Sequence, residues 1–178
     1  MTLKHALPTV LLTGIAIMLT GARLEYFEES LPTTLNPLYA NSMVDHRTQE
    51  LIFDRLWYRD PITNNLTSRI LESRWEAVPP DGLAIKFTVR EGINWHSGAP
   101  LTAKDVCFTV DAMLDPGTPS ELAAKYREYL AGCETQGQRG VTIRFNRVYH
   151  NPRDRLGFSV LPHAEFSSTA ITPDAMSQ

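Results

Sequence analysis

The 178 residues suit one domain, or one domain preceded by a targeting segment. Hydrophobic residues make up 43% and charged residues 21%, which excludes a disordered chain and a coiled coil. A formal net charge of −3 provides no basic footprint, so no nucleic-acid partner is expected. The densest basic cluster, RVYHNPRDR at 147–155, contains Asp154 and favours a solvated face over a phosphate-binding patch.

The first 22 residues have the layout of a secretory signal peptide. Lys4 provides a positive start, Leu7 to Leu19 is mostly apolar, and small residues stand at Thr20 and Ala22. Cleavage after Ala22 would release residues 23–178 into the periplasm. The apolar run is shorter than the roughly 20 residues that a membrane-spanning helix needs. If the segment stayed uncleaved, it would anchor the protein in the membrane.

The first elements are expected before residue 66. Alternation predicts a strand at 23–30, and two prolines keep the next segment loop-like. A helix is expected over 44–58, with N-cap oxygens at its start and an apolar stripe that includes Leu51 and Leu56. The polar stretch at 59–65 then predicts a turn.

The clearest strand pattern covers 83–90, where apolar and polar residues alternate. PPDG at 79–82 joins it to a preceding strand in a hairpin. Thr102 caps a helix that runs to Leu114, and Asp105 completes a variant capping box. A second helix over 120–132 and a strand around 141–145 follow. Together these elements predict one mixed α+β unit, with a mainly antiparallel sheet and a few flanking helices.

Cys107 and Cys133 are the only cysteines. In an oxidising compartment the sequence favours a structural disulfide between them, over two separate buried thiols or a reactive thiol. By closing a loop in the unfolded chain, this disulfide would contribute about 3 kcal/mol to stability. Neither cysteine belongs to a CxxC motif, so the pair does not indicate a zinc site.

His96, Ser97 and Asp105 are the residue types of a hydrolytic triad, but their arrangement does not favour catalysis. WHSGAP is not a GxSxG elbow, and Asp105 has a capping role at a helix N-terminus. The histidines form no HxH, HxxxH or HExxH pattern, so no metal and no cofactor are expected. A secreted hydrolase acting through His96 or His150 is the least favoured hypothesis.

Several motifs occur in a specific order. They are TLNPLY, ELIFDRLWYRDP, FTVREGINWHSGAPLTAKDVCFT and LDP, followed by VTIRF and VLPHAEF. In this order they resemble the bacterial extracellular solute-binding proteins of family 5, which are the periplasmic dipeptide-, oligopeptide- and nickel-binding receptors of ABC transporters. The resemblance runs from about Leu24 to Phe166.

The resemblance implies the fold of the N-terminal subdomain of a two-lobed, type II-like periplasmic binding protein that is not an enzyme. It implies a peptide-like ligand and an ABC transporter permease as partners. In peptide-binding members the segment after the Asn-Pro pair touches the ligand backbone. Carried over by position, this gives Asn41, Ser42 and Met43 as ligand-side residues. The family's aromatic contact after LDP is not carried over, because Leu122 stands at that position.

Members of the family are much longer than this chain. We therefore expect an N-terminal portion, residues 23–178, that is truncated before the second lobe and is either incomplete or completed by a separately encoded C-terminal lobe. The alternative is an exported structural or interaction module that keeps the subdomain fold without ligand capture.

Overall fold

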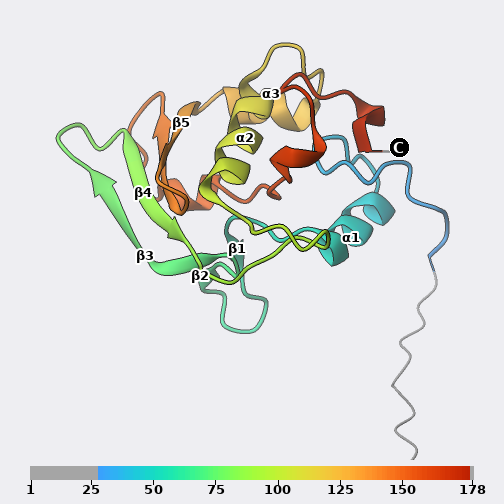
Figure 1. The fold of residues 1–178 in the computed structure, drawn as a ribbon, viewed down its shortest axis with the longest axis horizontal. Helices are drawn as coiled ribbons and strands as arrows, with labels where there is room; N and C mark the ends of the chain where they lie inside the picture. The colour runs from blue at the N-terminus through green and yellow to red at the C-terminus, as the bar shows by residue number, and fades with distance from the viewer. Residues whose placement is uncertain (1–27, 177–178) are drawn as a thin grey trace, which may run out of the picture.

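The computed structural model describes residues 28–176 (Figure 1). The expected signal peptide at 1–22 and most of the first predicted strand lie outside the described residues. Its described part, residues 28–30, is not in a strand. Within the described range, no helix has the length and apolar character needed to cross a membrane.

The elements follow one another as α1 (Met43–Ile52), β1 (Tyr58–Arg59), β2 (Leu66–Thr67), β3 (Leu71–Val78), β4 (Ala84–Val89), α2 (Ala103–Leu114), α3 (Glu121–Arg127), β5 (Leu130–Gln136) and β6 (Gly140–Phe145). Three short 3-10 helices complete the order: η1 (Pro152–Arg155), η2 (His163–Glu165) and η3 (Pro173–Met176). The main sheet has the order β3-β4-β6-β5, and β1 pairs with β2. Every pairing is antiparallel, which confirms the predicted α+β class.

The core lies between this sheet and α2, which crosses it in Figure 1. Val106, Val110 and Met113 of α2 are fully buried, as the apolar spacing predicts, and they belong to the same hydrophobic core as Phe87 of β4 and Ile143 of β6. The alternation that predicts the β4 strand is therefore confirmed, as is its hairpin with β3. The predicted disulfide is also confirmed, because Cys107 of α2 is bonded to Cys133 of β5.

The predicted helix over 44–58 is wrong in its second half, because α1 ends at Ile52. The next residues are extended and pair with a segment distant in the sequence. Leu56 N donates to Phe158 O over 2.8 Å, and Trp57 N donates to Leu156 O over 3.1 Å. This pairing buries both side chains in the core, and Trp57 packs edge-on against the ring of Phe87.

The second predicted helix, over 120–132, is also too long, because α3 ends at Arg127. Leu130 to Gln136 form β5 instead, which pairs with β6 along the edge of the main sheet. Leu130 is buried opposite Phe145 in this register. Tertiary pairing therefore overrides the helical pattern of the sequence at this point.

Candidate ligand-binding surface at the start of α1

Asn41, Ser42 and Met43 lie where an extended loop meets the first turn of α1. Ser42 is the N-cap residue, and its Oγ accepts from Asp45 N over 3.0 Å. Asp45 in return accepts from Ser42 N over 3.1 Å, which completes a capping box. The amides of Ser42 and Asp45 at the start of the helix are therefore satisfied from within the chain.

The Asp45 carboxylate also anchors the loop that precedes the helix. Its oxygens accept from Thr33 N at 2.6 Å and Thr33 Oγ1 at 2.9 Å. Longer hydrogen bonds reach it from Thr34 N and Asn41 N, both at 3.3 Å. One fully buried carboxylate thus holds both ends of the loop.

Burial alone would raise the pKa of Asp45, but the hydrogen bonds from Ser42, Thr33 and Asn41 together lower that pKa well below its ordinary value of 3.8. Asp45 is therefore charged at neutral pH. A charge near the N-terminal end of α1 is also favoured by the helix dipole.

Gln49 supports the same loop one turn further along α1. Its Nε2 donates to Thr34 O at 3.3 Å and to Asn36 O at 3.2 Å. Asn36 is fully buried, and its Oδ1 accepts from Leu38 N. The inward face of α1 is thus polar, with Asp45 and Gln49 buried. This arrangement corrects the predicted apolar stripe, since Leu51 is 70% exposed.

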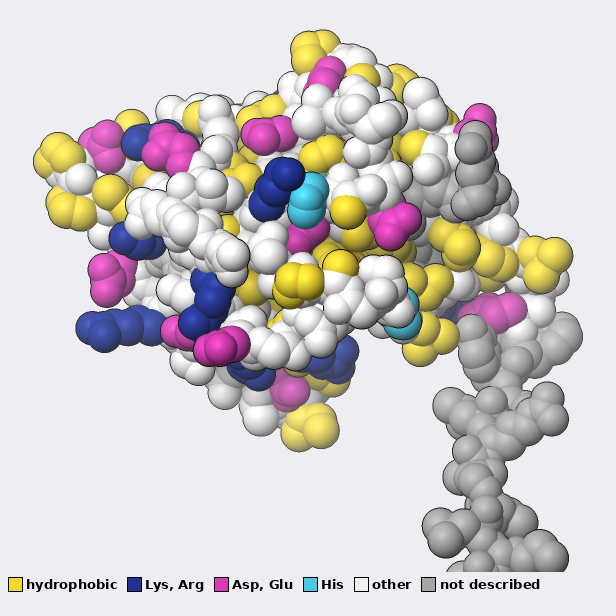
Figure 2. Space-filling view, viewed as in Figure 1, with side chains coloured by type: hydrophobic (Ala, Val, Ile, Leu, Met, Phe, Trp, Pro, Cys, Tyr) yellow, Lys and Arg dark blue, Asp and Glu magenta, His cyan; other side chains and the backbone are white. Residues whose placement is uncertain are grey.

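The backbone of the loop is fixed while two of the predicted residues remain accessible. Asn41 is exposed and the Met43 side chain is 65% exposed. Figure 2 shows hydrophobic side chains gathered over the side of the molecule where α1 and the loop lie. Large exposed hydrophobic residues of these two segments are Leu31, Leu35, Met43 and Leu51. The surface can therefore offer apolar contact beside polar groups with set positions.

A cavity of about 350 Å³ lies at the opposite end of α1. Ile52 and Phe53 line it together with Trp95 and His96. The indole Nε1 of Trp95 is buried and has no hydrogen-bond partner among the described residues. Since Asn41 to Met43 are at the helix start, the structure does not join this cavity to the predicted ligand residues.

The predicted turn at His96 and Ser97 is confirmed, and the triad residues are not assembled. Trp95 N donates to Ala99 O, and Gly98 closes the turn with a positive φ of 85°. The carboxylate of Asp105 is hydrogen bonded to Thr102 in a capping box instead.

Asp105 has a second partner that sequence reasoning missed. Its Oδ1 accepts from His163 N at 2.9 Å and lies 2.7 Å from His163 Nδ1. The two residues are 58 positions apart and no local motif links them. The pair ties η2 to the first turn of α2, which is a structural role. Among residues 28–176, no group of three His, Cys, Asp or Glu side chains could hold a metal ion.

Comparison with known proteins identifies the family. The model of the bacterial extracellular solute-binding proteins, family 5 Middle, matches residues 65–175, which is more than half of the chain. The chain belongs to this family. Family 5 is a non-enzymatic solute-binding family.

Curated relatives agree with this assignment. Protein XP55 of Streptomyces lividans is 40% identical over 81% of this chain and 23% of its own length. A probable di/tripeptide-binding protein of Pseudomonas aeruginosa is 30% identical over 88% of this chain and 34% of its own length. The chain thus spans between about a fifth and a third of the length of these relatives.

Solved structures share the fold. The oligopeptide-binding protein AppA of Bacillus subtilis, in complex with a nonapeptide, superposes with a TM-score of 0.70 at 24% identity, over 83% of this chain and 29% of AppA. NikZ of Campylobacter jejuni, in complex with Ni(L-His), gives a TM-score of 0.67 at 23% identity, over 82% of this chain and 29% of NikZ. These neighbours are two-lobed periplasmic binding proteins, and this chain has the fold of one part of them.

Proposed function

We propose that this chain forms part of a periplasmic binding component of an ABC transporter for dipeptides or oligopeptides. Asn41, Ser42 and Met43 form one wall of the ligand site, and further polypeptide, such as a separately encoded C-terminal lobe, forms the other wall. The chain reaches the periplasm by the signal peptide at 1–22 and delivers its ligand to a membrane permease.

The observation that carries the proposal is the anchored loop before α1. Its backbone is held by the buried Asp45 carboxylate, while Asn41 and Met43 stay exposed. A preformed backbone reduces the conformational entropy lost on binding, which favours recognition of a peptide main chain. Membership of family 5 and relatives named as peptide-binding proteins support a peptide as the ligand.

A peptide bound only to the wall formed by residues 41–43 would remain largely in contact with water. Ligand sites commonly bury about 70–90% of a small ligand. We therefore expect weak binding or none by residues 23–178 alone, and measurable binding when the remaining polypeptide is present.

Isothermal titration calorimetry with trialanine tests this proposal. The titration is run on the purified chain alone and on the chain co-expressed with the product of the reading frame downstream. Met43→Ala is expected to weaken binding by the second preparation about tenfold, which corresponds to about 1.4 kcal/mol. Ile62→Ala is the matched control, because Ile62 is 92% exposed in the turn between β1 and β2.

If trialanine and longer peptides bind neither preparation, the peptide-binding proposal is wrong. An exported structural or interaction module would then be the better description of the chain.

A further inference from the structure

Two adjoining cavities, together called the groove below, share lining residues and lie away from the start of α1. The larger, of about 660 Å³, lies between the end of α1, the β1–β2 hairpin and η1. The smaller, of about 400 Å³, lies beside η1 and the aromatic residues Tyr129 and Tyr149. Asp154 and Gly157 line both cavities. The basic segment 147–155 of the sequence therefore contributes to a shaped surface.

Arginines outnumber carboxylates in this groove. Its lining includes five arginines, which are Arg55, Arg59, Arg69, Arg153 and Arg155. The lining carboxylates are Glu50, Asp54 and Asp154, so the side chains carry a net charge of +2. The whole chain has a formal charge of −3, which makes this local excess of positive charge a distinct feature.

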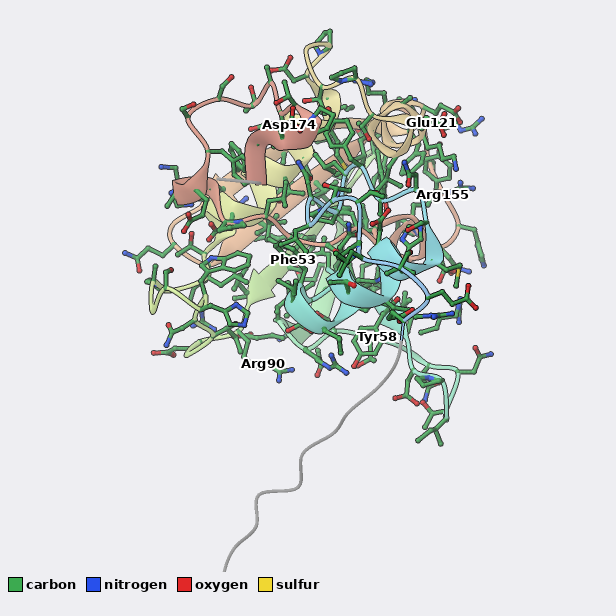
Figure 3. The ribbon with its side chains drawn as sticks, turned by 90° about the vertical axis from the view of Figure 1, so that its right-hand side faces the viewer. Phe53, Tyr58, Arg90, Glu121, Arg155 and Asp174 are labelled. Atoms are coloured by element: carbon green, nitrogen blue, oxygen red, sulfur yellow. A yellow bond between two sulfur atoms is a disulfide. The ribbon has the colours of Figure 1, made fainter. Side chains whose placement is uncertain are left out.

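Aromatic rings hold the guanidinium groups in place. Arg153 lies 4.6 Å from the ring centre of Trp75, and Arg155 lies 4.7 Å from that of Tyr149. Arg69 lies 5.2 Å from the ring centre of Tyr58. Figure 3 shows Tyr58 and Arg155, one from each cavity, on the same side of the molecule. A guanidinium group that contacts a ring through its face can still donate its in-plane N–H groups to a planar anion.

Three of the lining arginines already bind carboxylates of the chain itself. Asp154 lies 2.6 Å from Arg59 NH2, and Asp54 lies 3.2 Å from Arg69 NH1. Arg55 pairs with Glu50. Among the described residues, no carboxylate forms an ion pair with Arg153 or Arg155, and both contact aromatic rings instead. Within residues 28–176, these two guanidinium groups therefore have no ion-pair partner.

Ion pairing alone does not account for this arrangement. Exposed ion pairs contribute only about 0–1 kcal/mol each, and two uncompensated positive charges add repulsion. We propose that the groove binds a small solute that carries two or more carboxylates, and that Arg153 and Arg155 are its main contacts. The site lies apart from Asn41 to Met43 and does not depend on peptide binding there.

Carboxylates fit the groove better than phosphates. A guanidinium fork matches the planar carboxylate in two parallel hydrogen bonds. Each cavity, of about 660 and 400 Å³, also lies in the range of small-molecule sites, roughly 300–1,000 Å³.

Calorimetry with citrate as the probe, at low ionic strength, tests the proposal on the full chain. Arg153→Gln and Arg155→Gln are each expected to weaken citrate binding about tenfold. Arg74→Gln is the matched control, since Arg74 is on β3, is 88% exposed and lines neither cavity. It removes the same charge and is expected to change the affinity less than twofold.

Chemical-shift mapping provides a second measurement if a glutamine variant folds poorly. In the unaltered chain, citrate is expected to shift the amide signals of Tyr149 and Gly157 and to leave those of Asn41 and Met43 unchanged. The proposal is overturned if citrate does not bind, if sulfate binds as tightly, or if Arg74→Gln weakens binding as much as Arg153→Gln. None of these outcomes affects the trialanine experiment, so the two proposals are tested separately.

Discussion

The Asp45 carboxylate offers the sharpest test of how the loop before α1 is held. If Asp45 acted only as a partner in the capping box, Asp45→Ala would cost about 1 kcal/mol of unfolding free energy. The structure predicts more, because Thr33 N and Thr33 Oγ1 also donate to the carboxylate, at 2.6 and 2.9 Å. Hydrogen bonds to a charged group contribute about 1.5–3 kcal/mol each, although their sum is not additive.

We therefore expect Asp45→Ala to lower the free energy of unfolding by about 3–4 kcal/mol, since the two bonds at 3.3 Å add little. Urea unfolding followed by circular dichroism measures this loss. The matched control is Asp60→Ala, because the carboxylate of Asp60 accepts from Ile62 and Thr63 within its own exposed turn. A loss of about 1 kcal/mol or less for Asp45→Ala, equal to that of the control, would refute the anchoring role.

Three further outcomes follow from the contacts. The Cys107→Ser/Cys133→Ser double variant should lose about 3 kcal/mol of unfolding free energy, measured in urea, and an unchanged midpoint would show that the bond is not formed. The pKa of Asp45 is lowered in the folded protein, so the stability it contributes is present above its ordinary pKa of 3.8 and is lost as the pH falls below that value. Asp45→Asn should reduce this loss of unfolding free energy between about pH 5 and pH 2, a range that brackets the ordinary pKa. If the free energy of unfolding of the variant falls with pH as steeply as that of the unaltered chain, the assignment is contradicted. Burial raises the pKa of Tyr126 to about 12 and also raises the pKa values of Tyr129 and Tyr39, so ultraviolet titration of the folded chain should show tyrosines that ionise above the ordinary value of 10.0, and Tyr126→Phe should lower their number by one.

Elements with complete local signals could be predicted from the sequence. Thr102 and Asp105 mark the start of α2, and Val106, Val110 and Met113 give its buried face. The β4 strand follows from alternation because one of its faces is buried. In these cases the pattern and the tertiary environment favour the same structure.

Elements that depend on distant partners could not be predicted in the same way. Leu56 and Trp57 continue an apolar pattern that is compatible with a helix, but their backbone pairs with Phe158 and Leu156 about a hundred positions away. Leu130 likewise fits a helix until β6 is present beside it. A single sequence contains no signal for either pairing.

The candidate sites also combine residues that the sequence predicts with distant contacts that only the structure shows. The resemblance pointed to Asn41, Ser42 and Met43, but the anchoring of their loop by Asp45 involves Thr33, 12 positions before it. The groove lined by five arginines brings together Arg59 and Asp154, which are 95 positions apart. The sequence predicts a solvated face for the basic segment 147–155, and its contacts with distant residues are visible only in the fold.

The central claim is that Asn41 to Met43 form a wall of a peptide site. Photo-crosslinking in the host's periplasm tests it most directly, because any polypeptide that completes the site is present there. The probe is trialanine with a benzophenone amino acid in place of its central residue. We predict an adduct within residues 40–43 that excess trialanine prevents. An adduct confined to other parts of the chain, or no adduct that trialanine prevents, would contradict the claim.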